Sequence, residues 1–95
     1  MNRICIEPTK FTDVRTGNET FGYRAWDDFA QTYNNCLDSI PDDDLMFLAA
    51  ILGQGADDTL NAMLDYCAEN QHSLQIGKEW YTWKQIQPIV EKARK

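Results

Sequence analysis

The sequence lacks lysine and arginine throughout its middle. Between Arg24 and Lys78, fifty-three residues hold no cation, while ten carboxylates lie from Asp27 to Glu69. The residues before this stretch carry a net charge of +1 and those after it carry +3, which gives −6 for the chain. Because a concentrated acidic field attracts basic surfaces and repels phosphate, it predicts a cationic protein partner and argues against direct binding of nucleic acid.

Long apolar runs and paired cysteines are also missing. The longest apolar run, Leu45 to Leu52, has eight residues, far fewer than the roughly 18 that a membrane-spanning helix needs. The three cysteines are odd in number and too widely spaced for a Cys-x-x-Cys site, and no secretory leader precedes them. We therefore expect a cytoplasmic protein with reduced thiols that does not bind membranes.

Metal and cofactor signatures are absent as well. Asp42, Asp43 and Asp44 lack the spacing of a calcium-binding loop, and the Gly53-Gln54-Gly55 segment matches neither phosphate-binding glycine fingerprint. The sequence predicts no metal site and no cofactor. Ordinary globular composition remains: 43% hydrophobic residues and eleven aromatics among 95 residues predict one folded domain, residues 1–95.

The amino-terminal part reads as strands. Ile4 and Ile6 alternate with polar neighbours, which predicts a short strand ended by Pro8. Thr16-Gly17-Asn18 then separates residues 11–15 from residues 19–24, as in a hairpin.

The middle of the chain predicts three helices. From Trp26, apolar residues recur at spacings of three and four as far as Ile40. Pro41 should end this helix and open the next, whose body is apolar on every side and therefore needs cover from several directions or from a partner. After Gly53 and Gly55, a third helix starts at Asp57 or Asp58 and buries Leu60, Met63, Leu64 and Cys67.

The carboxyl-terminal part predicts a second hairpin and a short helix. Gly77 supplies the turn after Leu74 to Ile76, and Thr82 with Gln85 forms a capping box. Pro88 predicts a short turn over residues 83–87 and a helix only from Pro88 onward. The expected fold is α+β: a small antiparallel sheet from the amino- and carboxyl-terminal hairpins packs against three central helices and a short C-terminal helix.

The acidic residues have two interpretations. Those at helix starts are explained as caps, which stabilise a helix by roughly 0.3–1 kcal/mol each through its dipole. Asp38, Asp65 and Glu69 fall late in the expected helices, where the dipole disfavours an anion, so capping does not explain them. The second interpretation is a partner-binding acidic face made of Asp27, Asp28, Asp38, Asp42, Asp43, Asp44, Asp57, Asp58, Asp65 and Glu69.

Trp80, Tyr81 and Trp83 form a second candidate binding site, an aromatic edge. In a strand, Trp80 faces one way while Tyr81 and Trp83 face the other, so at least one face needs cover. These rings serve either the rim of the core or an interface, because tryptophan and tyrosine dominate binding hot spots.

Three classes of function follow. The first is a cytoplasmic inhibitor or modulator that occupies the basic surface of a nucleic-acid-processing protein through acids standing where phosphates would sit. In size and charge the chain resembles the small acidic anti-restriction and anti-CRISPR proteins of phages and mobile elements, with no motif that identifies a family. The second is a homo-oligomeric assembly module, such as a homodimer, that uses the apolar helix or the aromatic edge. The third, a small enzyme using Cys67 and His72, is the weakest, so we expect no enzyme.

Overall fold

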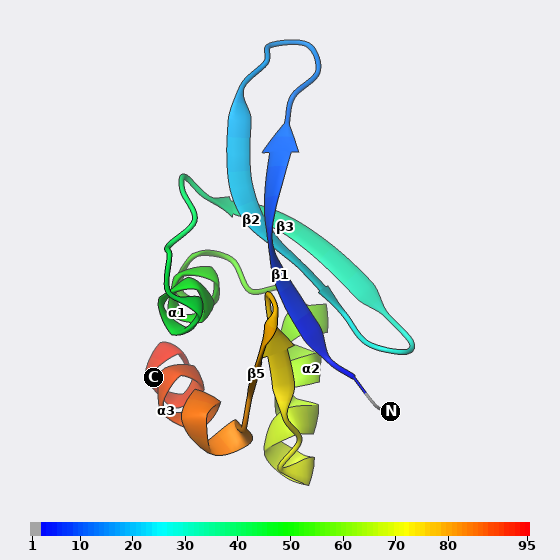
Figure 1. Ribbon diagram of the computed structural model, residues 1–95, viewed down its shortest axis with the longest axis vertical. Helices are drawn as coiled ribbons and strands as arrows, with labels where there is room; N and C mark the ends of the chain where they lie inside the picture. Colours follow the sequence, from blue (N-terminus) through cyan, green and yellow to red (C-terminus); the bar gives the residue numbers. More distant parts are fainter. Residues whose placement is uncertain (1–2) are drawn as a thin grey trace.

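The computed structural model describes residues 3–95 and has an α+β fold, as the sequence predicts (Figure 1). Five strands form one mixed sheet, and three helices pack against one of its faces. The strands are β1 (Cys5–Thr12), β2 (Glu19–Trp26), β3 (Gln31–Leu37), β4 (Leu74–Ile76) and β5 (Glu79–Tyr81). The helices are α1 (Asp44–Gln54), α2 (Asp58–Asn70) and α3 (Trp83–Ala93).

The order of the strands in the sheet is β3-β2-β1-β4-β5. β1 pairs antiparallel with β2, and β2 with β3, so the first three strands form a meander. β4 and β5 form the predicted second hairpin, in which Gly77 takes a left-handed backbone with φ +61°. β4 joins β1 in parallel, with Cys5 opposite Gln75, so the sheet is mixed and not purely antiparallel as expected.

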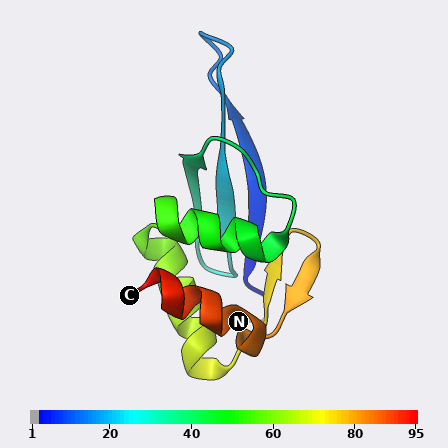
Figure 2. The same cartoon turned by 90° about the vertical axis from the view of Figure 1, so that its left-hand side faces the viewer.

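β1 continues through Pro8, where the sequence predicts its end. The carbonyls of Ile4 and Ile6 accept hydrogen bonds from the N–H groups of Gln75 in β4 and of Gly77 just after it, so the backbone polar groups of these alternate residues face that strand. β4 ends at Ile76, opposite Ile6, and the missing N–H of Pro8 therefore costs no ladder bond. The long hairpin that results projects beyond the helices at its turn (Figures 1 and 2).

The helix predicted from Trp26 to Ile40 is wrong, because these residues form the end of β2, a turn and β3. β3 runs at the edge of the sheet, and its inward-facing Thr32 and Asn34 make hydrogen bonds. Asn34 Nδ2 donates to the carbonyl of Gly55, while the Thr32 hydroxyl donates to Asp57. In β3 the inward-facing side chains are therefore polar and hydrogen-bonded. For this reason the three- and four-residue spacing of apolar residues does not identify the residues that are buried.

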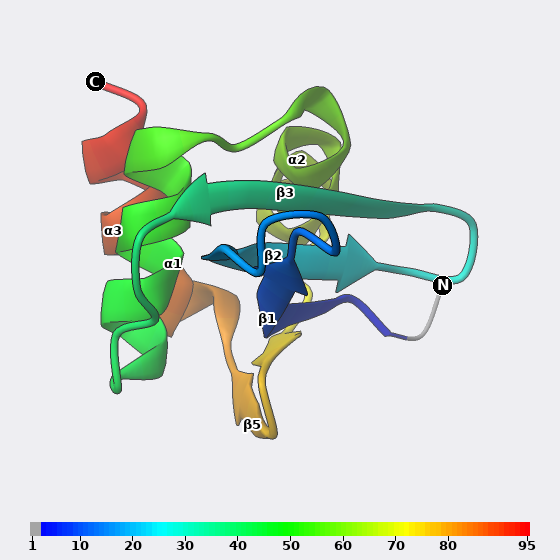
Figure 3. The same ribbon diagram turned by 90° about the horizontal axis from the view of Figure 1, so that it is seen from above.

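The other two central helices form as predicted in their bodies. α1 begins at Asp44 rather than at Pro41, because Asp43 caps it by accepting from the backbone N–H groups of Leu45 and Met46 at 2.9 and 3.0 Å. α2 buries its expected stripe, and Asp57 caps it by accepting from the N–H of Leu60 at 2.9 Å. α1 and α3 lie next to each other on one side of the strands, and α2 lies apart from them near β3 (Figure 3).

α3 is one continuous helix from Trp83 to Ala93, so the expected break before Pro88 is wrong. The predicted capping box is present, and the Gln85 side-chain oxygen accepts from the N–H of Thr82 at 2.9 Å. Trp83, Ile86 and Val90 are buried on both sides of the proline. Their burial offsets the one hydrogen bond that Pro88 removes from the helix.

Candidate protein-binding surface

The turn between β2 and β3 presents an aromatic side chain to solvent on a firmly held backbone. Asp27 Oδ1 accepts from the N–H groups of Phe29 and Ala30 at 2.7 and 2.8 Å, and the N–H of Asp27 donates to the Ala30 carbonyl at 2.9 Å. Phe29 is 82% exposed at the tip. An aromatic ring left this exposed on a hydrogen-bonded turn is a candidate anchor for a partner.

The amino end of α2 lies beside this turn. A hollow of about 450 Å³ separates the two, and Asp27, Ala30, Asp58 and Tyr66 are among the residues that line it. Asp57, the cap of α2, is tied to β3 through Thr32. The structure therefore brings together three of the ten candidate acids, Asp27, Asp57 and Asp58, although the sequence places them on separate elements. We call this region, together with Phe29, the turn–α2 surface.

A second acidic group lies at the amino end of α1. Asp42, Asp43 and Asp44 are consecutive here, and Asp44 accepts a hydrogen bond of 2.7 Å from the hydroxyl of Tyr81. This bond, with desolvation and the charges of Asp44, Asp43 and Glu79, raises the pKa of Tyr81 to about 12. α1, which is about 16 Å long at a rise of 1.5 Å per residue, runs between this group and the segment that leads to Asp57.

The remaining acids are dispersed. Asp38 is exposed just after β3, Glu69 is exposed near the end of α2, and Asp65 pairs with Arg94 at 2.7 Å. Asp27, Asp28 and Asp38 lie in turns and loops, not on the helices where the sequence predicts them. The capping interpretation holds for Asp43 and Asp57, whose carboxylates accept from helix amides.

Cations are scarce around these acids in the folded chain. Within residues 3–95, no lysine or arginine lies within 4.0 Å of the carboxylates of Asp38, Asp42, Asp58 or Glu69. Their negative charge is therefore not neutralised by a neighbouring side chain and remains open to a cationic partner.

The outer face of the sheet carries a cluster that sequence reasoning missed. The guanidinium carbon of Arg24 lies 4.3 Å from the centroid of the Trp26 ring and 5.9 Å from that of Tyr33. Arg24 also pairs with Glu7 at 3.2 Å, and Phe11 meets Tyr33 edge-on with centroids 6.5 Å apart. Had the alternation of β2 been followed as far as Trp26, the shared face of Arg24 and Trp26 would have been visible in the sequence.

The predicted aromatic edge is divided between core and solvent. Trp83 is 6% exposed and Tyr81 packs against the core, which matches the prediction that one side is covered. Trp80 points the other way and is 52% exposed on the edge strand β5. Trp80 alone of the three therefore remains available as an interface residue.

The Cys67 and His72 pair does not have the arrangement of a nucleophile and its base. Cys67 is fully buried in the stripe of α2, and burial raises the pKa of its thiol to about 11. A reactive cysteine needs a lowered pKa and access to substrate. His72 instead turns its Nδ1 to the carbonyl of Ser73 at 2.5 Å.

Metal ligands do not gather in the described part of the chain: among residues 3–95 no three histidine, cysteine or acidic side chains lie close enough together to hold a metal ion. None of the helices within these residues is long and apolar enough to cross a membrane. Comparison of the chain with protein-family models, with curated proteins and with solved structures finds no match. What the protein binds is therefore inferred from its own surface.

Proposed function

We propose that this protein is a small binding module, an inhibitor or modulator, that docks its turn–α2 surface on the basic surface of another protein. One observation carries the proposal: Phe29, 82% exposed, stands on the turn that Asp27 holds, and Asp27 lines a hollow together with Asp58 at the start of α2. An exposed apolar anchor with carboxylates on one side has the form of an interface centre with an electrostatic rim.

The favoured partner class is a protein that processes nucleic acid. Such proteins carry lysine- and arginine-rich grooves that accept phosphate, and carboxylates spaced along a surface offer the same charge to those grooves. Restriction and CRISPR nucleases have grooves of this kind, which supports an anti-defence role of the type that phages and mobile elements encode. The chain itself, at −6, is repelled by nucleic acid, so the protein groove and not the duplex is the target.

The two parts of the surface have different tasks. Exposed charges mainly accelerate encounter and choose between partners, because salt screens them and each contributes only about 0.2–1 kcal/mol. A buried aromatic anchor contributes more, about 2 kcal/mol or above when it is a hot spot. Phe29 should therefore set the lifetime of the complex, and Asp58 its salt dependence.

The test is competition with DNA. A purified restriction endonuclease and a purified CRISPR nuclease are each incubated with a labelled cognate duplex, and displacement and cleavage are followed as the protein is added. We expect displacement that weakens as salt rises, with Phe29→Ala weakening it at least tenfold and Asp58→Asn by a few fold. Both positions are exposed, and a thermal melt of each variant verifies the fold.

Asp38→Asn is the matched control, because it removes the same charge from an exposed loop outside the turn–α2 surface. We expect it to leave displacement close to that of the unchanged protein. Displacement that is indifferent to salt and to both Phe29→Ala and Asp58→Asn would contradict the proposal, as would equal losses from Asp58→Asn and Asp38→Asn.

A further inference from the structure

α1 has one apolar side that the fold leaves open. Phe47, Leu48 and Ile51 are buried against the sheet and the other helices. On the opposite side, Met46 is 64% exposed and Ala49 is also exposed. The sequence predicts that this helix is covered either from several directions or by a partner, and within the described residues the side that carries Met46 has no such cover.

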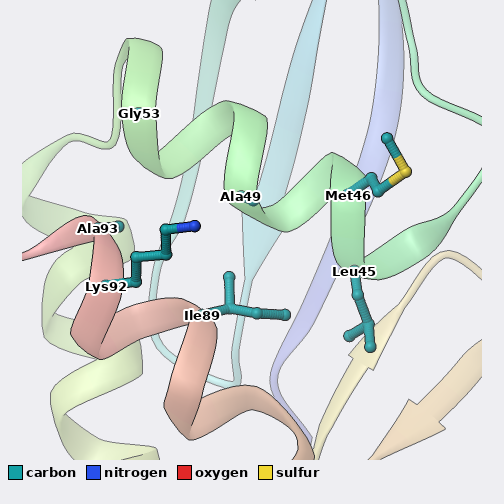
Figure 4. A pocket seen from close by; sticks show the side chains of 7 residues that line it. All are labelled: Leu45, Met46, Ala49, Gly53, Ile89, Lys92 and Ala93. Atoms are coloured by element: carbon teal, nitrogen blue, oxygen red, sulfur yellow. The ribbon is translucent and has the colours of Figure 1, made fainter.

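A groove runs along this open side between α1 and α3. Its volume is about 470 Å³, and it is lined by Leu45, Met46, Ala49 and Gly53 of α1 and by Ile89, Lys92 and Ala93 of α3. In Figure 4, Ile89 and Lys92 point towards α1, while Met46 points away from α3. Lys92 supplies the one charged side chain of this lining, and it reaches over the groove from α3 (Figure 4). An apolar groove with a single cation at its rim suits an apolar helix that carries an acid near one end.

The two ends of this groove carry opposite charges. Asp42, Asp43 and Asp44 lie at the amino end of α1, next to Leu45 and Met46. Lys92 lies in the last turn of α3, and α3 runs in the same direction as α1 (Figures 2 and 4). The acidic end and the basic end thus lie at opposite ends of one apolar strip.

We propose that this groove is the interface of a symmetric homodimer. A two-fold axis perpendicular to α1 turns the second copy end for end, which brings Met46 of each copy into the groove of the other. The same rotation places Lys92 of each copy near the acidic amino end of the other copy's α1. Ala49 and Gly53 have little or no side chain, so they let the two α1 helices approach closely.

This charge arrangement selects a second copy as the occupant. One chain supplies both the acidic and the basic end in the register that the rotation requires, so every contact is formed twice. The net charge of −6 on each copy opposes association, but at physiological salt it is screened beyond about 8 Å. The contacts between Lys92 and the aspartates fall within that distance.

The experiment is sedimentation velocity of the full chain over roughly a hundredfold range of concentration, since a dimer shows itself by mass action. We expect a monomer–dimer equilibrium in the unchanged protein, and a dissociation constant raised at least about tenfold by Met46→Lys. Val14→Lys is the matched control: it makes the same kind of change at a 95% exposed residue in the β1–β2 turn and should leave the equilibrium unchanged. A protein that stays monomeric throughout overturns the proposal, and so does a Met46→Lys variant that dimerises like the unchanged protein.

A charge exchange tests the orientation. Asp42→Lys and Lys92→Asp should each weaken the dimer severalfold, and the double variant should restore it, because the two positions meet across the axis. Asp42 is exposed and does not cap α1, so the exchange leaves the helix start intact. Failure of the double variant to recover overturns the two-fold arrangement. Phe29 lies outside this groove, so the dimer and the binding of a partner protein are measured separately.

Discussion

The two faces of the five-stranded sheet are held by different forces. The inner face is aliphatic, and Ile4, Ile6 and Ile76 are fully buried beneath the helices. The outer face is cationic and aromatic, and Arg24 lies against Trp26 and Tyr33, outside the core cluster that the helices cover. The inner face therefore stabilises the fold by excluding water, whereas the outer face and the turn at its edge keep side chains available for contact.

The largest contrast should come from truncating one residue on each face. Ile6→Ala removes a fully buried side chain and should lower the free energy of unfolding by about 2–5 kcal/mol. Tyr33→Ala removes a side chain that is 52% exposed, and it should cost at most about 1 kcal/mol. Urea denaturation followed by circular dichroism measures both, and equal losses would mean that the outer face is part of the core.

A hydroxyl on the inner face should matter more than one on the outer face. The Tyr23 hydroxyl donates to the Gly55 carbonyl at 3.3 Å and accepts from the N–H of Asp57 at 3.1 Å. Tyr23→Phe leaves that partly buried N–H without an acceptor, which should cost about 1 kcal/mol or more. Tyr33→Phe is the control, since its hydroxyl has no hydrogen bond within residues 3–95, and it should change stability little. If Tyr23→Phe and Tyr33→Phe lower the free energy of unfolding by similar amounts in the same denaturation assay, the prediction is wrong.

The outer cluster should depend on the shape of Arg24 as well as on its charge. Arg24→Lys keeps the charge but loses the planar group that lies against Trp26, and it should cost about 0.5–1 kcal/mol. The emission of Trp26 should shift as well. Arg15→Lys, in the exposed β1–β2 turn, is the matched control and should alter neither quantity. An unchanged stability in Arg24→Lys would show that the stack contributes nothing.

The smallest effect lies at the rim of the inner face and appears only at high pH. The pKa of Tyr81 is about 12 in the folded chain, above its ordinary value of about 10. Because the folded pKa is raised, its contribution to stability is fully present below pH 10 and is lost as pH rises towards 12. Absorbance of tyrosinate, with Tyr81→Phe subtracted, should show this late titration, and Asp44→Asn should lower the pKa. No change on Asp44→Asn would mean that another group causes the shift.

The fold was predictable from the sequence where the apolar residues of a periodic pattern are also the residues that are buried. In α2, Leu60, Met63, Leu64 and Cys67 recur at helical spacing and are all buried. Gly77 marks the second hairpin and Thr82 with Gln85 marks the start of α3, because each of these residues has a local geometric task.

β3 was not predictable because its pattern is inverted. Tyr33 points outward, while Thr32 and Asn34 point inward and bond to the segment that joins α1 to α2. These partners are distant in the chain, so no local periodicity reveals them. Pro88 was misjudged for a related reason: burial of Ile86 and Val90 stabilises a helix that its own sequence would interrupt.

The sequence predicted the composition of the candidate surface but not which of its residues lie together. The excess of acids could be counted, but the nearness of Asp27 to Asp58 depends on the β2–β3 turn, which the sequence predicted as helix. Phe29 was likewise assigned to an apolar stripe, although it lies at the tip of that turn. The residues of a surface that two elements build together cannot be predicted before the positions of both elements are known.

The position of β1 in the middle of the sheet also governs the order in which the chain can complete itself. β1 can pair with β2 as soon as both have been synthesised, whereas its other edge, at Cys5 and Ile6, pairs with Gln75 and Ile76, which are synthesised much later. Until then a nascent chain exposes a bare apolar strand edge, the kind of edge on which chains stick together. A shortened product that stops before β4 should therefore aggregate, so the short β4–β5 hairpin protects the newly made protein as well as completing its sheet.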